Sequence, residues 1–387
     1  MKKIKLAVVT GSRADYGLLS YFLKEAKKHY DLNLIVTGAH LKKDFGNTLD
    51  YIQKDKIKIS KKIDIKIKDG KGAVANSISI GIKKFNKFFE KSSFDFIILL
   101  GDRYEIFSCA ISAAIIRIPI IHLHGGEVTT NSYDEYFRHS ISIFSQYHFV
   151  SAKKYYNRLI QLGNNPKNIF LVGGLGAANI KKIKFLSRKK LKKKLDIDFK
   201  TNNIFFIYHP ETLEKNYGIN GLINSLDVLS EFKNLNIFIS STNADSQYKK
   251  FHMIINKFAK LNKNFKILNT LKHEEYLSLL RHMDGIIGNS SSGILEAPSL
   301  KIPTLNIGGR QDGRLRAKSI LDCSYHKEEI KLKINKILKF KNNKNLYNNP
   351  YDHGDSVKKI ISKIKTLKKN ISKNKAFFDL NIQNIKK

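Results

Sequence analysis

Short runs of apolar, often β-branched residues alternate along the chain with longer segments of helical pattern. Each run ends in small or polar residues. This alternation is typical of βαβ units and predicts a parallel sheet. The first series of predicted strands is Leu6–Thr10, Leu32–Thr37, Phe96–Leu100, Pro119–His122, His148–Ser151 and Ile169–Val172.

A second series of strands follows a lysine-rich stretch at 181–200. Two series of parallel strands predict an α/β protein with two Rossmann-like domains and a boundary near residue 185. The expected organisation is a domain over 1–185, a second over 186–365 and a helical tail over 366–387. Two amphipathic helices are predicted near the end, and we expect the last helix to return over the first domain. The second series is Ile204–Tyr208, Asn236–Ile239, Lys266–Leu268, Gly285–Ile287 and Thr304–Ile307, and the two helices are Ser356–Lys368 and Phe377–Ile385.

Length and composition support two globular domains. The chain has 387 residues, 42% of them hydrophobic, and only 6 prolines. This excludes a single small binding module and a disordered chain. No stretch has the roughly 18–20 apolar residues needed to cross a bilayer. The start, Met1–Lys3, leads directly into a strand-like run and not into a signal-peptide core. We therefore expect a cytoplasmic protein without a membrane partner.

The formal charge of +37 is the most unusual number in the composition. Such an excess raises the possibility of nucleic-acid binding, because cations release counterions from a phosphate backbone. The excess is almost all lysine and is spread along the chain, so we expect solvated faces and no nucleic-acid partner. Two local runs, Arg188–Lys194 and Lys358–Lys375, are predicted to be exposed helix faces. Cys109 and Cys323 are interpreted as reduced packing residues.

Polar residues gather after the predicted strands of the first series, where open parallel sheets bind ligands. The segment 11–17, Gly-Ser-Arg-Ala-Asp-Tyr-Gly, predicts a turn into a helix at which backbone N–H groups and an arginine can meet an anion. His40 follows the second strand and is either a ligand of substrate or a satisfied loop residue. Asp102 and Arg103 end the third strand, and burying such charges is costly unless they face a cleft.

Two histidines and a glutamate follow the fourth strand, in the segment His122-Leu-His124-Gly-Gly-Glu127. A metal site is one interpretation of this set. General acid–base chemistry is favoured over it, because the glycines turn the chain away after His124. A further cluster, Asp134 to His139, opens a predicted helix.

The second series has its own polar strand ends. The segment 288–293, Gly-Asn-Ser-Ser-Ser-Gly, stands between a strand and a predicted helix that carries Glu296. N–H groups and hydroxyls at such a helix start favour phosphate, and an acidic residue nearby can accept hydrogen bonds from a ribose diol. Arg310 and Arg314 lie in the loop after the last strand, where guanidiniums can neutralise a diphosphate.

Taken together, these segments resemble the UDP-N-acetylglucosamine 2-epimerase family, in particular its hydrolysing branch that supplies N-acetylmannosamine for sialic acid synthesis. The similarity runs over about residues 4–365. It implies a glycosyltransferase-B-like fold, a UDP-sugar substrate, and no metal or other cofactor. The segments that carry it are 11–17, 36–38, 101–105, 124–127, 138–140, 209–212 and 288–293.

The resemblance also implies roles for individual residues. Asp102 and Asp134 match acid–base positions. Where many relatives have a glutamate, this chain has His124, so either His124 or Glu127 is expected to replace that carboxylate. Arg138 completes the predicted catalytic set. The predicted substrate-binding residues are Arg13, Asp15, His40, Arg103, His209, Asn243, Ser290, Ser291, Glu296, Arg310 and Arg314.

Three alternatives remain open at this point. The sugar could be a UDP-2,4-diacetamido-trideoxy sugar of the legionaminic acid type. A glycosyltransferase on the same scaffold would share the UDP site but would also need an acceptor site. Relatives suggest a homo-oligomer, either a dimer or a tetramer formed through helices of the first domain.

Overall fold

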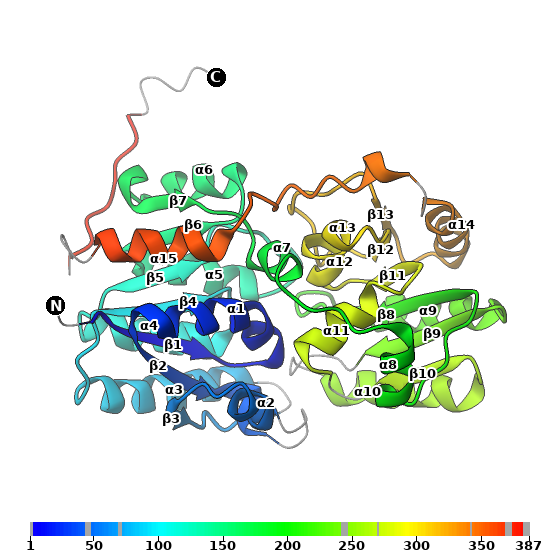
Figure 1. Cartoon of the computed structure of the whole chain (residues 1–387), viewed down its shortest axis with the longest axis horizontal. Coiled ribbons are helices and arrows are strands. Elements are labelled where there is room, and N and C mark those ends of the chain that lie inside the picture. The colour runs from blue at the N-terminus through cyan, green and yellow to red at the C-terminus, as the bar shows by residue number, and fades with distance from the viewer. Residues whose placement is uncertain are drawn as a thin grey trace.

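The computed structural model describes residues 3–42, 48–68, 72–240, 247–268, 271–340, 343–367 and 374–381. Two α/β units lie side by side in it (Figure 1). Each contains a parallel sheet with helices on both faces, so the predicted fold class, two Rossmann-like domains, is confirmed.

The first sheet has seven strands in the order β3-β2-β1-β4-β5-β6-β7. Its central strands are buried apolar runs, as expected for a parallel sheet covered on both faces. The strands are β1 (Lys5–Thr10), β2 (Asp31–Thr37), β3 (Ile59–Ile63), β4 (Phe96–Leu100), β5 (Ile120–Leu123), β6 (Tyr147–Val150) and β7 (Ile169–Leu171). The helices between them are α1 (Arg13–His29), α2 (Thr48–Lys54), α3 (Ala73–Phe89), α4 (Tyr104–Ile115), α5 (Asp134–Phe144), α6 (Lys153–Gln161) and α7 (Leu175–Ile180).

The second sheet has six strands in the order β10-β9-β8-β11-β12-β13. These are β8 (Asn202–Ile207), β9 (Leu235–Ser240), β10 (Phe265–Leu268), β11 (Gly285–Gly288), β12 (Thr304–Ile307) and β13 (Ile320–Cys323). The helices of this domain are α8 (Arg188–Leu195), α9 (Ile219–Glu231), α10 (Tyr248–Leu261), α11 (His273–Leu280), α12 (Ser291–Leu295), α13 (Ala297–Leu300) and α14 (Lys327–Leu338). One more helix, α15 (Ser356–Leu367), follows them along the chain. Residues 172–201 join the two sheets and contain the boundary predicted near residue 185.

All eleven strands predicted from the sequence are present, but two strands were not predicted. Both unpredicted strands lie at sheet edges, where each pairs with a single strand among the described residues. β3 carries exposed lysines at positions 61 and 62, and β13 carries exposed Asp322. A polar edge strand lacks the continuous apolar run by which buried parallel strands are identified.

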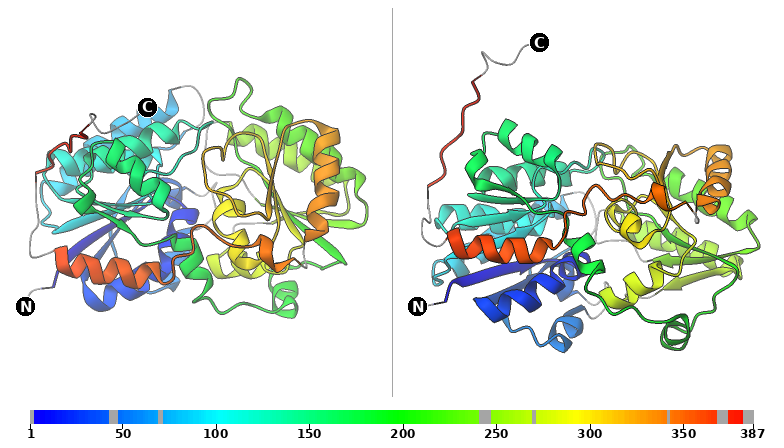
Figure 2. Two further views of the ribbon diagram at one scale, coloured as in Figure 1. Left: turned by 90° about the horizontal axis from the view of Figure 1, so that it is seen from above. Right: turned by 45° about the horizontal axis from the view of Figure 1, so that its top comes forward.

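The chain returns to the first domain with α15, the first of the two helices predicted near the end. α15 packs on α1 and α7 (Figure 2), and Val357, Ile360 and Ile364 join the apolar core of the first domain. The hydroxyl of Tyr30 donates a 2.6 Å hydrogen bond to the carbonyl of Ile361. This crossover ties the two domains together at a second point besides the 172–201 connection.

The prediction of a helix over Phe377–Ile385 is wrong for the part of this range that the structure describes. Residues 374–381 form neither helix nor strand, and 382–385 lie outside the described residues. The N–H of Phe378 donates to the carbonyl of Gly163, so this backbone group bonds to the first domain and not within a helix. Lys375 donates to the carbonyls of Ser142 and Ile143, at the end of α5.

Most of the described lysines in the two basic runs are exposed, as predicted. On α8 only Leu191 is buried, which agrees with an exposed basic face. In the second run, Lys375 departs from the prediction, because it is half-buried against α5. Cys109 and Cys323 are both free and buried. No helix in the described ranges is both long enough and apolar enough to span a bilayer.

Candidate active site

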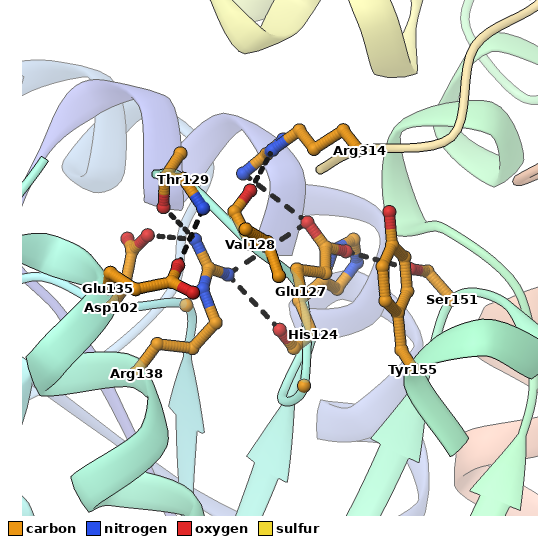
Figure 3. A network of polar contacts seen from close by, with 12 residues as sticks. Asp102, His124, Glu127, Val128, Thr129, Glu135, Arg138, Ser151, Tyr155 and Arg314 are labelled. Atoms are coloured by element: carbon orange, nitrogen blue, oxygen red, sulfur yellow. Dashed lines mark hydrogen bonds and ion pairs between the residues drawn. The ribbon is translucent and has the colours of Figure 1, made fainter. Parts of the chain in front are cut away.

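The polar strand ends of the two sheets meet at the junction of the domains. Figure 3 shows a network there that joins Asp102, His124, Glu127 and Arg138 of the first domain to Arg314 of the second. Four of these side chains are buried, and the fifth, Asp102, is 20% exposed. The network therefore presents one partly accessible carboxylate among fixed charges.

Asp102 follows β4 and is held by Arg138, which lies on the second turn of α5. An Nη atom of Arg138 forms a short hydrogen bond with the Asp102 carboxylate. The same guanidinium donates to the carbonyl of His124 at 3.2 Å and to the hydroxyl of Thr129 at 3.2 Å. These three contacts fix the position of the guanidinium, and with it the orientation of Asp102.

Glu127 is the most heavily paired carboxylate of the network. It accepts hydrogen bonds from His124 Nδ1 at 2.8 Å and Ser151 Oγ at 2.7 Å. Arg314 lies 3.4 Å and Arg138 3.9 Å from its other oxygen. Burial alone would raise the pKa of Glu127, but its contacts with His124 and Arg314 outweigh it and hold the pKa well below its usual range. Glu127 is thus a permanent carboxylate in this arrangement.

His124 has a defined tautomer because each ring nitrogen has a partner. The N–H of Leu175 donates to Nε2 at 3.2 Å, so Nε2 accepts, and Nδ1 carries the proton that is donated to Glu127. The residue has a φ of +62°, a left-handed conformation that is rare for residues other than glycine. Of the two candidates left open after β5, Glu127 is the charged group and His124 is the neutral group that it orients.

Asp134 begins α5, one helical turn before Arg138. It is buried, and its carboxylate accepts a 2.8 Å hydrogen bond from Ser132 Oγ. The preceding residue, Tyr133, contacts the second domain, because its N–H donates to Thr212 Oγ1 at 3.1 Å. Asp134 therefore lies on the first-domain side of the interface and close to the strand end of β8.

A cavity of about 110 Å³ lies between the start of α1 and the second domain. Arg13 forms part of its wall, with one Nη atom 3.4 Å from the carbonyl of Leu271. Both domains contribute to the lining, and five of the predicted substrate-binding residues are in it. They are Arg13, His209, Ser290, Ser291 and Glu296.

The predicted helix after β11 is shorter than expected. α12 has five residues, Ser291 to Leu295, and Glu296 lies at its end and not within a longer helix. Pro298 follows at the start of α13, where it lacks the N–H needed to continue the hydrogen-bonded helix. Ser290 is the N-cap, and its hydroxyl accepts the N–H of Ser292 at 3.3 Å.

Glu296 is buried in the wall of this cavity. Ser292 Oγ donates to its carboxylate at 2.5 Å, and Tyr276 in turn donates to Ser292 Oγ at 2.7 Å. Burial raises the pKa of Glu296 to about 7, although the bond from Ser292 acts in the opposite direction. A carboxyl group with this pKa changes its charge near neutral pH.

Asn289 and Gln311 organise the same region but were not singled out in the sequence. The amide of Asn289 bonds both to the N–H of His209 at 2.7 Å and to its carbonyl at 2.8 Å, which joins the ends of β8 and β11. Arg310 and Gln311 both donate to the carbonyl of Asn289, at 3.3 Å and 2.8 Å. Asn289 lies in the segment 288–293 and Gln311 directly follows Arg310, so both could have been found from their positions at strand ends. An uncharged amide, however, does not by itself indicate chemistry in a sequence.

Two of the predicted substrate-binding residues, His40 and Arg103, are bonded to side chains of their own domain. Both ring nitrogens of His40 are bonded, to Thr10 at 3.0 Å and Thr48 at 2.9 Å, and burial lowers its pKa to about 4. Of the two interpretations of His40, these contacts favour a loop residue whose hydrogen bonds are satisfied within its own domain. Arg103 pairs with buried Glu105 at 2.9 Å. Asn243 lies outside the described residues.

Asp15 follows the N-cap of α1 and accepts a hydrogen bond from the N–H of Gly11 at 3.3 Å. Burial, together with the charge of nearby Glu105, raises the pKa of Asp15 to about 7. Glu105 was not predicted as a site residue, although it lies in a quoted motif. A Cβ added to Gly11 would lie 2.4 Å from the side chain of Glu105, so glycine is required at this turn.

The two histidines at the end of β5, His122 and His124, bond to separate partners. His122 bonds to Ser142 at 3.0 Å and to the carbonyl of Gly101 at 2.7 Å. Throughout the ranges that the structure describes, no three His, Cys, Asp or Glu residues are grouped so as to hold a metal ion. The chemistry available here is that of carboxylates, an imidazole and guanidiniums.

A family model described as UDP-N-acetylglucosamine 2-epimerase matches residues 23–365. Among curated proteins, the chain is 37% identical over 383 residues to the polysialic acid biosynthesis protein P7 of Escherichia coli, covering 97% of each chain. It is 40% identical over 329 residues to a Campylobacter jejuni protein named GDP/UDP-N,N'-diacetylbacillosamine 2-epimerase (hydrolyzing). That match covers 83% of this chain and 85% of the relative.

The fold is also found among solved structures. The crystal structure of UDP-GlcNAc 2-epimerase from Neisseria meningitidis bound to UDP-GlcNAc matches with a TM-score of 0.78. The match covers 94% of this chain and all of that chain at 17% identity. At this identity the likeness establishes a shared arrangement of the two domains.

Proposed function

Because the chain belongs to the UDP-N-acetylglucosamine 2-epimerase family, we propose that it is a hydrolysing enzyme of this family. The proposed reaction converts UDP-N-acetylglucosamine and water into N-acetylmannosamine and UDP, as a step toward sialic acid. The observation that carries the proposal is the pairing of two half-sites at one junction. A carboxylate cluster lies on the first domain, and a cavity shared with the second domain is lined by Ser290 and Glu296.

The chemistry proceeds in two stages. A base removes the C2 proton of the sugar while the C1–O bond to UDP breaks, which gives 2-acetamidoglucal and UDP. Water then adds its oxygen to C1, and C2 receives a proton on the opposite face. This scheme needs an acid or base near each face of the ring and stabilisation of the departing diphosphate.

Asp102 and Asp134 are proposed to exchange the protons. Arg138 holds Asp102 in one orientation, and this carboxylate is partly accessible in an otherwise buried cluster. Asp134 approaches from the start of α5, next to the contact with Thr212. Glu127 is proposed to act through His124, because its own charge is neutralised by the surrounding cations.

The second domain is proposed to bind UDP. Ser290, Ser291, His209 and Arg310 would hold the diphosphate, and Arg13 would approach from the first domain. Glu296 would accept hydrogen bonds from the ribose hydroxyls. A cation next to the leaving diphosphate lowers the barrier to C1–O cleavage because negative charge develops there.

A related sugar is the second candidate, favoured by the Campylobacter jejuni relative that carries diacetylbacillosamine in its name. The two substrates differ at C4 and C6 of the sugar and share the same chemistry at C1 and C2. Incubating the purified protein with each UDP sugar, and following free UDP and the sugar by NMR, compares them directly.

The reaction class is tested in the same experiment. Run in D2O, the proposed mechanism releases UDP and places deuterium at C2 of the product. A UDP-linked epimer that accumulates without free UDP would indicate a non-hydrolysing epimerase. Transfer of the sugar to an added acceptor, with no free N-acetylmannosamine, would indicate the glycosyltransferase alternative. Asp102→Asn is the matched inactive control.

A further inference from the structure

Arg314 lies in the loop that follows β12, in the second domain, but the polar contacts of its side chain are with the first domain. Its Nε donates to the carbonyl of Val128 at 3.1 Å, and one Nη atom lies 3.4 Å from the carboxylate of Glu127 (Figure 3). The side chain is buried. Among the cations of the network, Arg314 is nearer to this Glu127 oxygen than Arg138, which lies at 3.9 Å.

The loop around Arg314 is docked on the first domain at several other points. Thr130 donates to the carbonyl of Asp312 at 3.1 Å. Gly313 has a φ of +83°, and an added Cβ there would lie 2.5 Å from Val128, so only glycine fits this approach. The hydroxyl of Tyr155 accepts the N–H of Leu315 at 3.3 Å.

The other end of the same loop belongs to the proposed nucleotide site. Arg310 donates to the carbonyl of Asn289, the residue directly before the N-cap Ser290. Only three residues, 311–313, therefore separate the arginine proposed to bind diphosphate from the arginine that pairs with Glu127. A loop attached at both ends can link occupancy of one half-site to the geometry of the other.

The charges of the network explain what Arg314 contributes. Two carboxylates, Asp102 and Glu127, face two guanidiniums, those of Arg138 and Arg314. With Arg314 in place, each carboxylate has its own cation. Without it, buried Glu127 would compete with Asp102 for Arg138, because an unpaired buried charge is costly.

We propose that Arg314 is a positioning residue that makes the first-domain carboxylate cluster complete only when the nucleotide-binding domain is docked. This inference rests on the proposed function and adds a regulatory step to it. Arg314 contacts no substrate in this scheme. It neutralises Glu127, and Arg138 is then left to orient Asp102.

The first test separates a positioning residue from a UDP ligand. We expect Arg314→Ala to lower kcat by about tenfold or more, with the affinity for UDP within about twofold of the parent in calorimetry. Arg314→Lys should recover part of the loss, because it restores the charge but not the two-point geometry. A tenfold loss of UDP affinity with kcat unchanged would overturn the inference.

The second test blocks docking of the loop without removing any charge. Gly313→Ala should reduce kcat in the same way as Arg314→Ala, because its Cβ would collide with Val128. Gly354→Ala is the matched control, since Gly354 also has a positive φ, +88°, but has open space around it. Equal activity of the two alanine variants would contradict the proposed docking.

The third test does not depend on turnover. Unfolding midpoints are measured with saturating UDP for the parent, Arg314→Ala, Glu127→Gln and the double variant. We expect Arg314→Ala to lower the midpoint in the parent and to have little effect in the Glu127→Gln background. Additive shifts would refute the coupling. If the parent releases UDP from neither sugar, the proposed function fails, whereas the Arg314–Glu127 coupling is still decided by this cycle.

Discussion

Arg138 on α5 and Asp102 after β4 form an ion pair at the mouth of the carboxylate cluster. The arginine is buried, whereas the side chain of Asp102 is 20% exposed. The pair thus presents its acidic member toward the junction and keeps its basic member inside. This asymmetry suits a carboxylate that has to meet a substrate in a fixed orientation.

Asp102→Asn and Asp134→Asn should each abolish most turnover and leave UDP affinity near that of the parent. Proton transfer by a positioned side chain is worth about 100- to 10,000-fold in rate, and an amide cannot replace it. UDP release measured by chromatography, with UDP binding measured by calorimetry, checks both parts. Near-normal turnover of Asp134→Asn would show that the acid–base assignment is wrong.

Arg310→Ala and Ser290→Ala should weaken UDP binding. A hydrogen bond to a charged group contributes about 1.5–3 kcal/mol, so each substitution should cost about 10- to 150-fold in affinity. Ser290 also caps α12, so its variant needs a thermal-unfolding control. Arg316→Ala is a matched arginine control, because Arg316 pairs with Asp312 and Asp322 within its own domain. Unchanged UDP affinity of Arg310→Ala would remove this arginine from the nucleotide site.

The pattern of strands and helices could be predicted because both sheets are parallel and buried. A buried strand must be apolar along its whole length, as β4 is over Phe96–Leu100. The rule fails for the edge strands β3 and β13, which carry exposed charged side chains. It also fails for the C-terminal tail, where tertiary contacts of Lys375 and Phe378 determine the backbone conformation.

Site residues could be predicted from the sequence where they directly follow strands, because the ends of neighbouring parallel strands meet at one edge of the sheet. Asp102, His124 and Glu127 are brought together because β4 and β5 are neighbours in the sheet. The sequence contained no sign that Arg314 reaches Glu127, since that contact depends on how the domains dock. The structural roles of Asn289 and Gln311 were hidden for a similar reason, because each depends on the pairing of distant loops.

The contact between Lys375 and the end of α5 is expected to stabilise the first domain. Its ammonium donates to the carbonyls of Ser142 and Ile143 and, at 2.6 Å, to Asn164 Oδ1. Burial disfavours the charged ammonium and lowers the pKa of Lys375 to about 7. Between that pKa and the ordinary value of a lysine the unfolded chain binds more protons than the folded state, so the parent gains stability as pH rises. Lys375→Met should therefore lower the free energy of unfolding, and increasingly so as pH rises through this interval in denaturant titrations. Lys358→Met, at an exposed position on α15, should change it little, and equal stability of the two variants would contradict the contact.

The raised pKa of Glu296 gives the nucleotide site a defined pH dependence. Burial raises this pKa to about 7, above the ordinary value of a glutamate in the unfolded chain. Between those two values the folded state binds more protons than the unfolded state, so stability falls as pH rises through this interval. Compared with Glu296→Gln, the free protein should lose thermal stability up to about pH 7 and then level off.

Binding of UDP should show the opposite trend with pH. The ribose hydroxyls donate hydrogen bonds, and an ionised Glu296 accepts them better than a protonated one. We expect UDP affinity to increase about three- to tenfold between about pH 6 and pH 8, with a much flatter profile in Glu296→Gln. Ionisation of the UDP phosphate affects both proteins equally, so the difference between the two calorimetric profiles isolates the carboxyl group. Parallel profiles would mean that Glu296 keeps its proton state when UDP binds, and the proposed ribose contact would then have to be abandoned.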